Sequence, residues 1–542
     1  MRSGLGPTPD QTRPTRAGLF WLTVLPPLVL GLVGLAMWAG HIPGDDEAAH
    51  VYKTALMHGH AAFVWDNYWY GGSYGMITYG FVYYWLAQYI GGRVLVALAA
   101  GLLPLLFHLY FRRAFGLQSR RPAWALAAVL AVYIVTWQNP YLLALALVLA
   151  GLVAVTYERP AVGALLVGVS LFTNPVAIIV GFVFAFADFV AHPAARRRWL
   201  IFAAFAAPFM LVRAAFTVLF PEGGWYMREW AVAVKAIAFA GLGFVAAGFS
   251  VDPERRGKQV LFATYGVICA LAFVLPQNAL GNNVVRFFYL LGVPLLLTIE
   301  RPRLPRAVVT LAVIAVAAVQ LASPVTYFQR TEDFRDSRAA FWAPALTFAA
   351  GACEPAYRVH VVMTRGHWDA YYFPINGFPI TRGWFREADA LHDRLFYGDY
   401  TAREYVAWLR EMGVEYVFLP HCPLDWTSAR EPAILAGSRD FTVVYATSDW
   451  TVYRLRDASP LAVALGGGTA SVEAMDHSSV TVRVGQAGDC LVKVTWSPYW
   501  TASSGAGLAR SADDFVVLRA PAAGTYRLRI DVTEGKLAGR LF

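Results

Sequence analysis

Long apolar runs separated by short charged segments fill the first 323 residues of the chain. The first run, 18–40, has the roughly 20 residues that a helix needs to cross a bilayer. Further runs follow at 93–111, 122–138, 140–157, 161–173, 174–191, 199–219, 229–249, 259–276, 284–299 and 306–323. The pattern therefore predicts an α-helical polytopic membrane domain over 18–325, with about eleven transmembrane helices.

Basic residues cluster in every second gap between these runs. The clusters contain Arg112, Arg113, Arg120 and Arg121, then Arg159, then Arg196 to Arg198, then Arg255, Arg256 and Lys258, then Arg301, Arg303 and Arg306. By the positive-inside rule these gaps and the N-terminal tail 1–17 are cytoplasmic. An odd number of spans then places the loop 41–92 and everything after 325 on the extracytoplasmic side.

Two places test this count. The segment 77–90 is apolar and aromatic but short, and counting it as a span would put Arg112 and Arg113 outside; a re-entrant or interfacial helix is predicted instead. The runs 161–173 and 174–191 meet at Thr173-Asn174-Pro175, where proline breaks a helix. One long kinked helix would put Arg159 and Arg196 on opposite sides, so two spans are predicted.

The chain changes character after the last apolar run. Over 326–458, strands at 358–364, 415–420, 441–446 and 451–455 surround a helix at 402–412 that ends before Gly413, a pattern that predicts an α/β domain. Over 459–542, short alternating strands at 479–484, 490–496, 515–519 and 524–532 predict a small β-sandwich.

Composition agrees with a membrane protein, because 57% hydrophobic and only 15% charged residues do not describe an ordinary soluble domain. The net charge of +9 is accounted for by the predicted cytoplasmic gaps, so it does not indicate nucleic acid binding. In an oxidising compartment Cys353 and Cys422 can form a disulfide, which leaves Cys490 single.

Three carboxylates and an imidazole follow the first apolar run: Asp45, Asp46, Glu47 and His50. Adjacent side chains point in different directions, so only one or two of the carboxylates are expected in a common site. One Asp can cap the following helix while another acts as a general base or, as Asp46 with Glu47, binds Mg²⁺ or Mn²⁺. His50 is either catalytic or an ordinary interfacial histidine.

Aromatic residues are dense from Trp65 to Tyr74, around Asp66. They form either an interfacial belt or a sugar-binding surface, since sugar faces stack on aromatic rings. Arg213, Lys235 and Arg286 lie in the outer halves of their predicted spans. They either bind a lipid phosphate or extend toward interfacial water.

Several of these motifs occur together in a known superfamily. The apolar span followed by Gly44-Asp45-Asp46-Glu47, the segment Tyr79-Gly80-Phe81-Val82-Tyr83-Tyr84 and the span closed by Tyr110-Phe111-Arg112-Arg113 resemble the GT-C superfamily of integral membrane glycosyltransferases. The resemblance implies that Asp45 or Asp46 is a catalytic base, sometimes with a metal. It also implies that Arg286 holds the phosphate of a polyprenyl-phosphate carrier.

The second half of the chain is similar to bacterial YfhO-like membrane proteins, some of them named 6-pyruvoyl-tetrahydropterin synthase-related. The similar motifs are His367-Trp368, Arg382-Gly383-Trp384, Tyr405-x-x-Trp408-Leu409, Gly413-Val414-Glu415-Tyr416-Val417 and Tyr499-Trp500. This resemblance implies a GT-C fold with one more transmembrane helix after the last domain, a segment that these 542 residues do not contain.

The resulting hypothesis is an inverting glycosyltransferase of a bacterial-type plasma membrane. It transfers a sugar from a polyprenyl-phosphate donor to an extracytoplasmic glycan, lipid or protein. Asp45 or Asp46 is the base, and the expected substrate-binding residues are Glu47, His50, Trp65, Asp66, Tyr79, Arg213, Lys235, Arg286 and His367. The alternatives are a transporter or flippase of an anionic or lipid-linked substrate, and a non-enzymatic assembly factor. The oligomeric state is left open.

Overall fold

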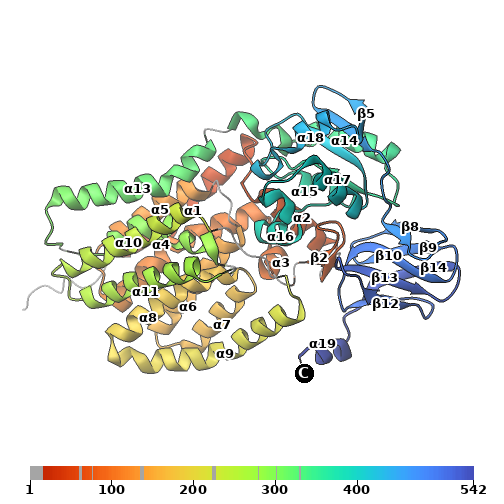
Figure 1. Ribbon diagram of the computed structural model, residues 1–542. Helices are drawn as coiled ribbons and strands as arrows, with labels where there is room; N and C mark the ends of the chain where they lie inside the picture. Colours follow the sequence, from red (N-terminus) through yellow and green to blue (C-terminus); the bar gives the residue numbers. More distant parts are fainter. Residues whose placement is uncertain are drawn as a thin grey trace, which may run out of the picture.

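A computed structural model describes residues 16–59, 64–75, 77, 79–134, 139–222, 228–276, 278, 280–300, 302–328 and 331–541. The apolar helices gather in one body, and the later part of the chain forms sheets and short helices at one end of it (Figure 1). The predicted tail 1–17 lies almost entirely outside the described residues.

Seven helices of the described chain are long and apolar enough to cross a membrane. They are α1 (Arg16–Ala39), α4 (Gly92–Phe115), α6 (Asn139–Thr156), α9 (Arg196–Leu219), α10 (Trp230–Gly248), α11 (Arg255–Val274) and α13 (Arg306–Phe328). Each covers one of the predicted apolar runs.

The other predicted runs form shorter helices: α5 (Arg121–Tyr133), α7 (Pro160–Leu171), α8 (Ile178–Ala191) after the 3-10 turn η2 (Pro175–Ala177), and α12 (Arg286–Leu296). Residues 135–138, at the end of one of these runs, lie outside the described residues. The break between α7 and α8 falls at Asn174, whose side chain accepts a hydrogen bond of 3.0 Å from the Val176 N–H. Seven helices of spanning length are therefore shown among the described residues, and the count of eleven spans stays a prediction.

The segment between α1 and α4 is a compact insertion. It contains α2 (Glu47–His58), the strand pair β1 (Trp65–Asp66) and β2 (Ser73–Tyr74), and α3 (Phe81–Ile90). With ten residues α3 is too short to span a bilayer, as its sequence predicts. It follows Gly80, which has a φ of 78° and no room for a side chain, because a Cβ there would lie 2.4 Å from the Tyr84 ring.

Small residues let the long helices approach one another. A Cβ on Gly151 of α6 would lie 2.8 Å from the carbonyl oxygen of Gly163 in α7, so the two backbones are in contact at this point. Gln320 of α13 is fully buried and bonds α12, since its Oε1 accepts from the Val293 N–H at 2.9 Å and its Nε2 donates to the Tyr289 carbonyl at 2.8 Å.

Ion pairs join the helix ends that carry the basic clusters. His192 lies between Asp188 at 2.6 Å and Glu254 at 2.7 Å, and Arg198 pairs with Asp188 at 2.9 Å. In the next connection the Arg303 N–H donates to the Phe249 carbonyl at 2.7 Å. These contacts hold together ends of the bundle that the charge pattern assigns to one side.

A mixed sheet of order β3-β4-β6-β5 follows the helical body. Strand β3 (Arg358–Val361) is parallel to β4 (Val414–Pro420), which pairs antiparallel with β6 (Trp450–Leu455), and β6 pairs antiparallel with β5 (Phe441–Ala446). Helices α14 (Ala339–Ala352), α15 (Asp369–Ile375), α16 (Arg386–His392), α17 (Ala402–Glu411) and α18 (Glu431–Gly437) accompany it. The apolar helix α14 was not expected from the sequence.

Two further four-stranded antiparallel sheets end the chain (Figure 1). One contains β7 (Ala462–Ala464), β10 (Gly488–Thr495), β12 (Gly507–Arg510) and β13 (Phe515–Ala520); the other contains β8 (Ala470–Met475), β9 (Ser479–Val484), β11 (Trp500–Ala502) and β14 (Gly524–Ile530). Both sheets contribute to a single hydrophobic core, for example Val492 from one and Val482 from the other. A short helix, α19 (Glu534–Leu541), follows.

The Cys353–Cys422 disulfide that the sequence left possible is not formed in this structure. Cys269, Cys353, Cys422 and Cys490 are all outside any disulfide. Cys353 comes directly after α14 and Cys422 directly after β4, two elements whose relative placement the sequence did not indicate.

Candidate functional site

A cavity of about 440 Å³ lies where the helical body meets the sheet domain. Its lining comes from the α1–α2 connection and α2, the β1–β2 pair, Tyr79 and α3, the start of η2, the end of α9, the start of α12 and the start of α16. Asp45, Asp46, His50, Tyr79, Arg213 and Arg286, six of the residues predicted from the sequence, all line this one cavity.

The three adjacent carboxylates separate, as neighbours in sequence should. Asp45 and Asp46 line the cavity. Glu47 points elsewhere: its two carboxylate oxygens accept from Arg93 at 2.7 and 2.8 Å, and one also accepts from the Gly44 N–H at 2.8 Å. Glu47 therefore does not line this cavity, and its carboxylate ties the start of α2 to α4; its expected substrate contact stays a prediction.

Asp46 occupies the capping position of α2 without capping it. Its side chain makes no hydrogen bond to the first turn of the helix. Instead the indole N–H of Trp384, 338 residues later in the chain, donates to Asp46 Oδ1 at 3.2 Å. The carboxylate is thus held at the cavity by a residue of the sheet domain.

The position of Asp46 raises the pKa of its carboxyl group above the ordinary value. Desolvation by the surrounding protein is the largest cause, and the positive charge of Arg286 and the Trp384 hydrogen bond oppose it. The negative charge of Glu387 raises the pKa further. A carboxylate whose pKa moves toward neutrality is a stronger base, which is the direction general-base catalysis needs.

His50 brings a buried imidazole to the cavity. Its Nδ1 lies 3.1 Å from the Tyr84 hydroxyl, and it is only 3% exposed. Its Nε2 has no hydrogen-bond partner among the described residues. Burial and the nearby charge of Arg286 lower the pKa of His50 to about 3, so the ring is neutral at ordinary pH. A buried, neutral Nε2 at a cavity is suited to hydrogen-bond a ligand.

Two arginines reach the cavity from the helical body. Arg286 is the first residue of α12, directly after the 3-10 turn η4 (Gly281–Val285), and its guanidinium lies 5.4 Å from the centre of the Tyr141 ring. Arg213 lies near the end of α9, where it hydrogen-bonds Thr217 at 3.3 Å. Lys235, the third predicted cation, is exposed on α10 and does not line the cavity, so its contact with a lipid phosphate or with interfacial water stays a prediction.

The sheet domain closes the cavity with the segment from Trp384 to Ala388. Gly383 lets this segment approach the bundle, since a Cβ there would lie 2.5 Å from the Trp69 ring. Arg386 is held by Asp425 at 2.6 Å. His367 stacks on Trp384 with ring centres 3.3 Å apart and contacts Asp425 at 3.1 Å. His367 therefore positions Trp384 and does not line the cavity, contrary to expectation.

Asp66 and Trp65 do not line the larger cavity. Asp66 is fully buried between Lys53 at 3.4 Å, the Tyr52 hydroxyl at 3.0 Å and His477 at 3.0 Å, so it cannot reach a substrate in the cavity. The Trp65 side chain is 2% exposed and borders a second, smaller cavity. Both residues attach the β1–β2 pair to its surroundings.

The predicted metal ligands do not converge. Asp46 is bonded to Trp384 and Glu47 to Arg93. In the part of the chain that the structure describes, no group of three or more Asp, Glu, His or Cys side chains is placed to hold a metal ion. A metal site made of Asp46 and Glu47 therefore does not fit, and no step is derived through one.

The other lining residues include Lys53, Trp69, Tyr70, Ser73, Tyr74, Tyr84, Asn174, Thr217, Glu222, Asn283, Trp384, Phe385, Arg386 and Glu387. Among them, Trp69, Tyr70, Ser73 and Tyr74 belong to the aromatic stretch that predicted an interfacial belt or a sugar-binding surface, and the others were not predicted as site residues. Two signals were available: Asn174 at the break between two apolar runs, and the mixed aromatic and charged run Trp384-Phe385-Arg386-Glu387 in the later domain.

No family model matches the chain, and no curated protein matches it in sequence. The resemblance to the GT-C superfamily therefore stays a prediction, and the function is argued from the geometry of the cavity.

Proposed function

We propose that this protein is an integral membrane glycosyltransferase that transfers a sugar from a polyprenyl-phosphate donor to an extracytoplasmic acceptor, with inversion at the anomeric carbon. One observation carries the proposal. Asp46, whose pKa is raised by burial, lines one cavity with two arginines that come from the ends of apolar helices. This arrangement combines a base for a hydroxyl group with cations for a phosphate.

The outer surface of the helical body supports placement in a bilayer. None of the 18-residue hydrophobic window of α9 is buried, and only 17% of that of α13 is. Continuous apolar surface of this kind is unfavourable in water and is typical of contact with lipid. The basic clusters lie at the opposite ends of the helices from the cavity, which supports an extracytoplasmic cavity under the positive-inside rule.

The donor would lie with its polyprenyl chain in the bilayer and its phosphate at Arg286 and Arg213. Charge-assisted hydrogen bonds from arginine are well suited to phosphate oxygens. The sugar would then occupy the cavity beside Tyr79 and Trp69, whose rings suit the apolar face of a pyranose. The neutral His50 would offer its Nε2 to a sugar hydroxyl.

The transfer would proceed in one displacement. Asp46 accepts the proton of the acceptor hydroxyl as its oxygen attacks the anomeric carbon. A new bond forms between the acceptor oxygen and this carbon, and the bond to the phosphate oxygen breaks. Polyprenyl phosphate departs with the electron pair, stabilised by the arginines. Attack from the face opposite the leaving group inverts the configuration.

The test uses the full chain reconstituted in lipid vesicles with a panel of polyprenyl-phosphate sugars and candidate acceptors. We expect release of polyprenyl phosphate, matched by a glycosylated product whose anomeric configuration is opposite to that of the donor. Movement of the donor across the bilayer with no release of carrier phosphate would contradict the proposal and favour a flippase.

A further inference from the structure

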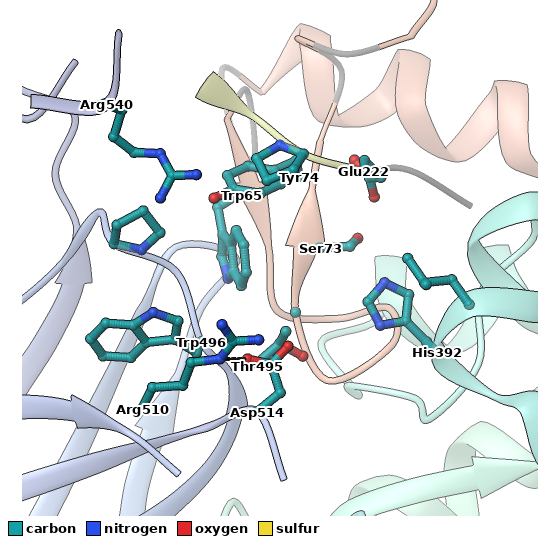
Figure 2. A pocket seen from close by; sticks show the side chains of 14 residues that line it. Trp65, Ser73, Tyr74, Glu222, His392, Thr495, Trp496, Arg510, Asp514 and Arg540 are labelled. Atoms are coloured by element: carbon teal, nitrogen blue, oxygen red, sulfur yellow. Dashed lines mark hydrogen bonds and ion pairs between the residues drawn. The ribbon is translucent and has the colours of Figure 1, made fainter. Parts of the chain in front are cut away.

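A second cavity of about 200 Å³ lies between the β1–β2 pair, the C-terminal sheets and the end of α16 (Figure 2). Trp65 and Tyr74 contribute from the strand pair, Trp496 from the connection after β10, and His392 from the end of α16. This cavity belongs to none of the steps proposed above.

Its lining combines aromatic rings with charged groups. Trp496 is half-buried beside the ion pair of Arg510 and Asp514, whose Nε and Oδ1 atoms lie 2.5 Å apart (Figure 2). Glu222 and Arg540 complete the charged groups, so acidic and basic side chains are balanced. Aromatic rings beside hydrogen-bond donors and acceptors suit a neutral sugar chain. The rings pack on the apolar faces of the sugars, and the charged side chains hydrogen-bond the sugar hydroxyls.

The two cavities are neighbours. Ser73, Tyr74 and Glu222 line both of them. Tyr70 of the larger cavity stacks on His392 of the smaller one, with ring centres 5.2 Å apart. The loop between β1 and β2 is fixed to the end of β10, since the Thr495 N–H donates to the Gly71 carbonyl at 2.9 Å. Ser73 and Tyr74 therefore belong to the border between the two cavities.

We infer that the smaller cavity is an acceptor subsite that binds the distal sugars of an oligosaccharide whose terminal hydroxyl reaches Asp46. The inference rests on the proposed function and names the acceptor class as a glycan chain. It assigns a binding role to the C-terminal sheets, which otherwise only support the β1–β2 pair.

The test compares transfer to a single sugar with transfer to linear neutral oligosaccharides of six hexose or N-acetylhexosamine units. We expect the parent protein to prefer the longer acceptor in kcat/KM. The double variant Arg510→Ala with Asp514→Ala removes an exposed ion pair. In this variant the ratio of kcat/KM for the six-unit acceptor to kcat/KM for the single sugar should fall about tenfold, while the rate with the single sugar changes little. Trp496→Ala should lower the preference for the long acceptor as the double variant does. Trp85→Ala, a control on the exposed surface of α3, should keep this preference.

If the ratio of kcat/KM for the long acceptor to kcat/KM for the single sugar is unchanged in the double variant, the proposed subsite is wrong. Direct binding separates this failure from failure of the transferase proposal. Calorimetric titration of the same six-unit oligosaccharides into the protein without donor should give binding that the double variant loses, even if no transfer is found. Absence of binding to the parent would also overturn the inference.

Discussion

The carboxyl group of Asp46 is controlled by side chains that reach it from distant parts of the sequence. Trp384 donates a hydrogen bond to it, and Arg286 and Arg386 act on it by their charge, all three lowering its pKa. Glu387 raises the pKa through its negative charge, and Glu387 is itself held by Asn283 Nδ2 at 3.1 Å. Burial exceeds the three lowering influences, so the net shift is upward.

Two substitutions should move the pH dependence of transfer in opposite directions. The proposed base works when deprotonated, so the rate falls as the pH drops through the pKa of Asp46. Trp384→Phe removes a hydrogen bond that lowers this pKa, so the acidic limb of kcat should move to higher pH. Glu387→Gln removes a charge that raises it, so the limb should move to lower pH. Shifts in the same direction would contradict this account of Asp46.

Arg286 should matter for donor binding more than any other cation of the helical body. Arg286→Gln removes a charge-assisted hydrogen bond to phosphate, so the KM for the donor should rise roughly 10- to 100-fold. Lys235→Gln is the matched control, because Lys235 is exposed on α10 away from the cavity. Equal effects of the two substitutions on donor KM would mean that general surface charge attracts the donor.

The helix α12 depends on a neighbour for its position. Pro294 lies inside it and cannot donate a backbone hydrogen bond. Gln320 of α13 bonds the carbonyls of Phe288 and Tyr289 and the N–H of Val293, and so joins the two helices at the turns before this proline. Because α12 begins with Arg286, this contact also helps fix the phosphate ligand.

Gln320→Leu should therefore destabilise the helical body by about 1–2 kcal/mol, since polar contacts between helices in a membrane contribute about this much. The free energy of unfolding in detergent or lipid measures the effect. Gln118→Leu serves as the control, because Gln118 is exposed in the connection after α4. A Gln320 variant as stable as this control would show that α12 is held by packing alone.

The β1–β2 pair is held in place by the buried contacts of Asp66 with Lys53, Tyr52 and His477. Removing one partner of a buried ion pair costs about 3–5 kcal/mol, so Asp66→Asn should lower the free energy of unfolding by that amount. Asp399→Asn, which breaks an exposed pair with Arg430, should cost no more than about 1 kcal/mol. Similar losses in both variants would contradict the structural role of Asp66.

The same group predicts how stability depends on pH. Interaction with Lys53 and hydrogen bonds outweigh burial and lower the pKa of Asp66 in the folded protein. Its contribution is therefore complete above the unfolded pKa of about 3.9 and is lost as the pH falls through the lower folded value. In Asp66→Asn this part of the acid dependence should be missing.

The sequence predicted those parts of the fold that local patterns determine. Apolar runs, the break at Pro175 and the change of character after residue 325 follow from hydropathy and backbone chemistry. The sequence also predicted Asp46, His50 and Arg286 as candidate site residues, because ionisable groups beside apolar runs are unusual. Trp384 and Glu387 were not predicted as site residues, because the aromatic and charged run that contains them does not by itself indicate that this loop of the later domain reaches the cavity.

In the molecule as a whole, the cavity is a shared product of three parts. The helical body supplies Arg286, the insertion after α1 supplies Asp46, and the sheet domain supplies Trp384. The C-terminal sheets hold the insertion through Asn67, whose N–H donates to the His477 carbonyl at 2.8 Å. Separation of any part should therefore disrupt the cavity.

The proposed orientation in the membrane can be tested with two matched substitutions. Ala523→Cys lies in the exposed turn between β13 and β14, and Ala194→Cys lies in the exposed connection between α8 and α9. In a background with the native cysteines replaced by alanine, a membrane-impermeant maleimide should label position 523 in intact cells. It should label position 194 only after permeabilisation. The reverse pattern would invert the topology.

The most direct test compares Asp46→Asn with Asp45→Asn in steady-state transfer from a polyprenyl-phosphate sugar. Both residues line the cavity, and the carboxyl group of Asp46 has a raised pKa and accepts the Trp384 hydrogen bond, which makes Asp46 the proposed base. Loss of a general base predicts that Asp46→Asn lowers kcat by about 10²–10⁴-fold with little change in donor KM, and that Asp45→Asn retains most of the rate. An Asp46→Asn variant that transfers sugar at the parent rate would contradict the central claim.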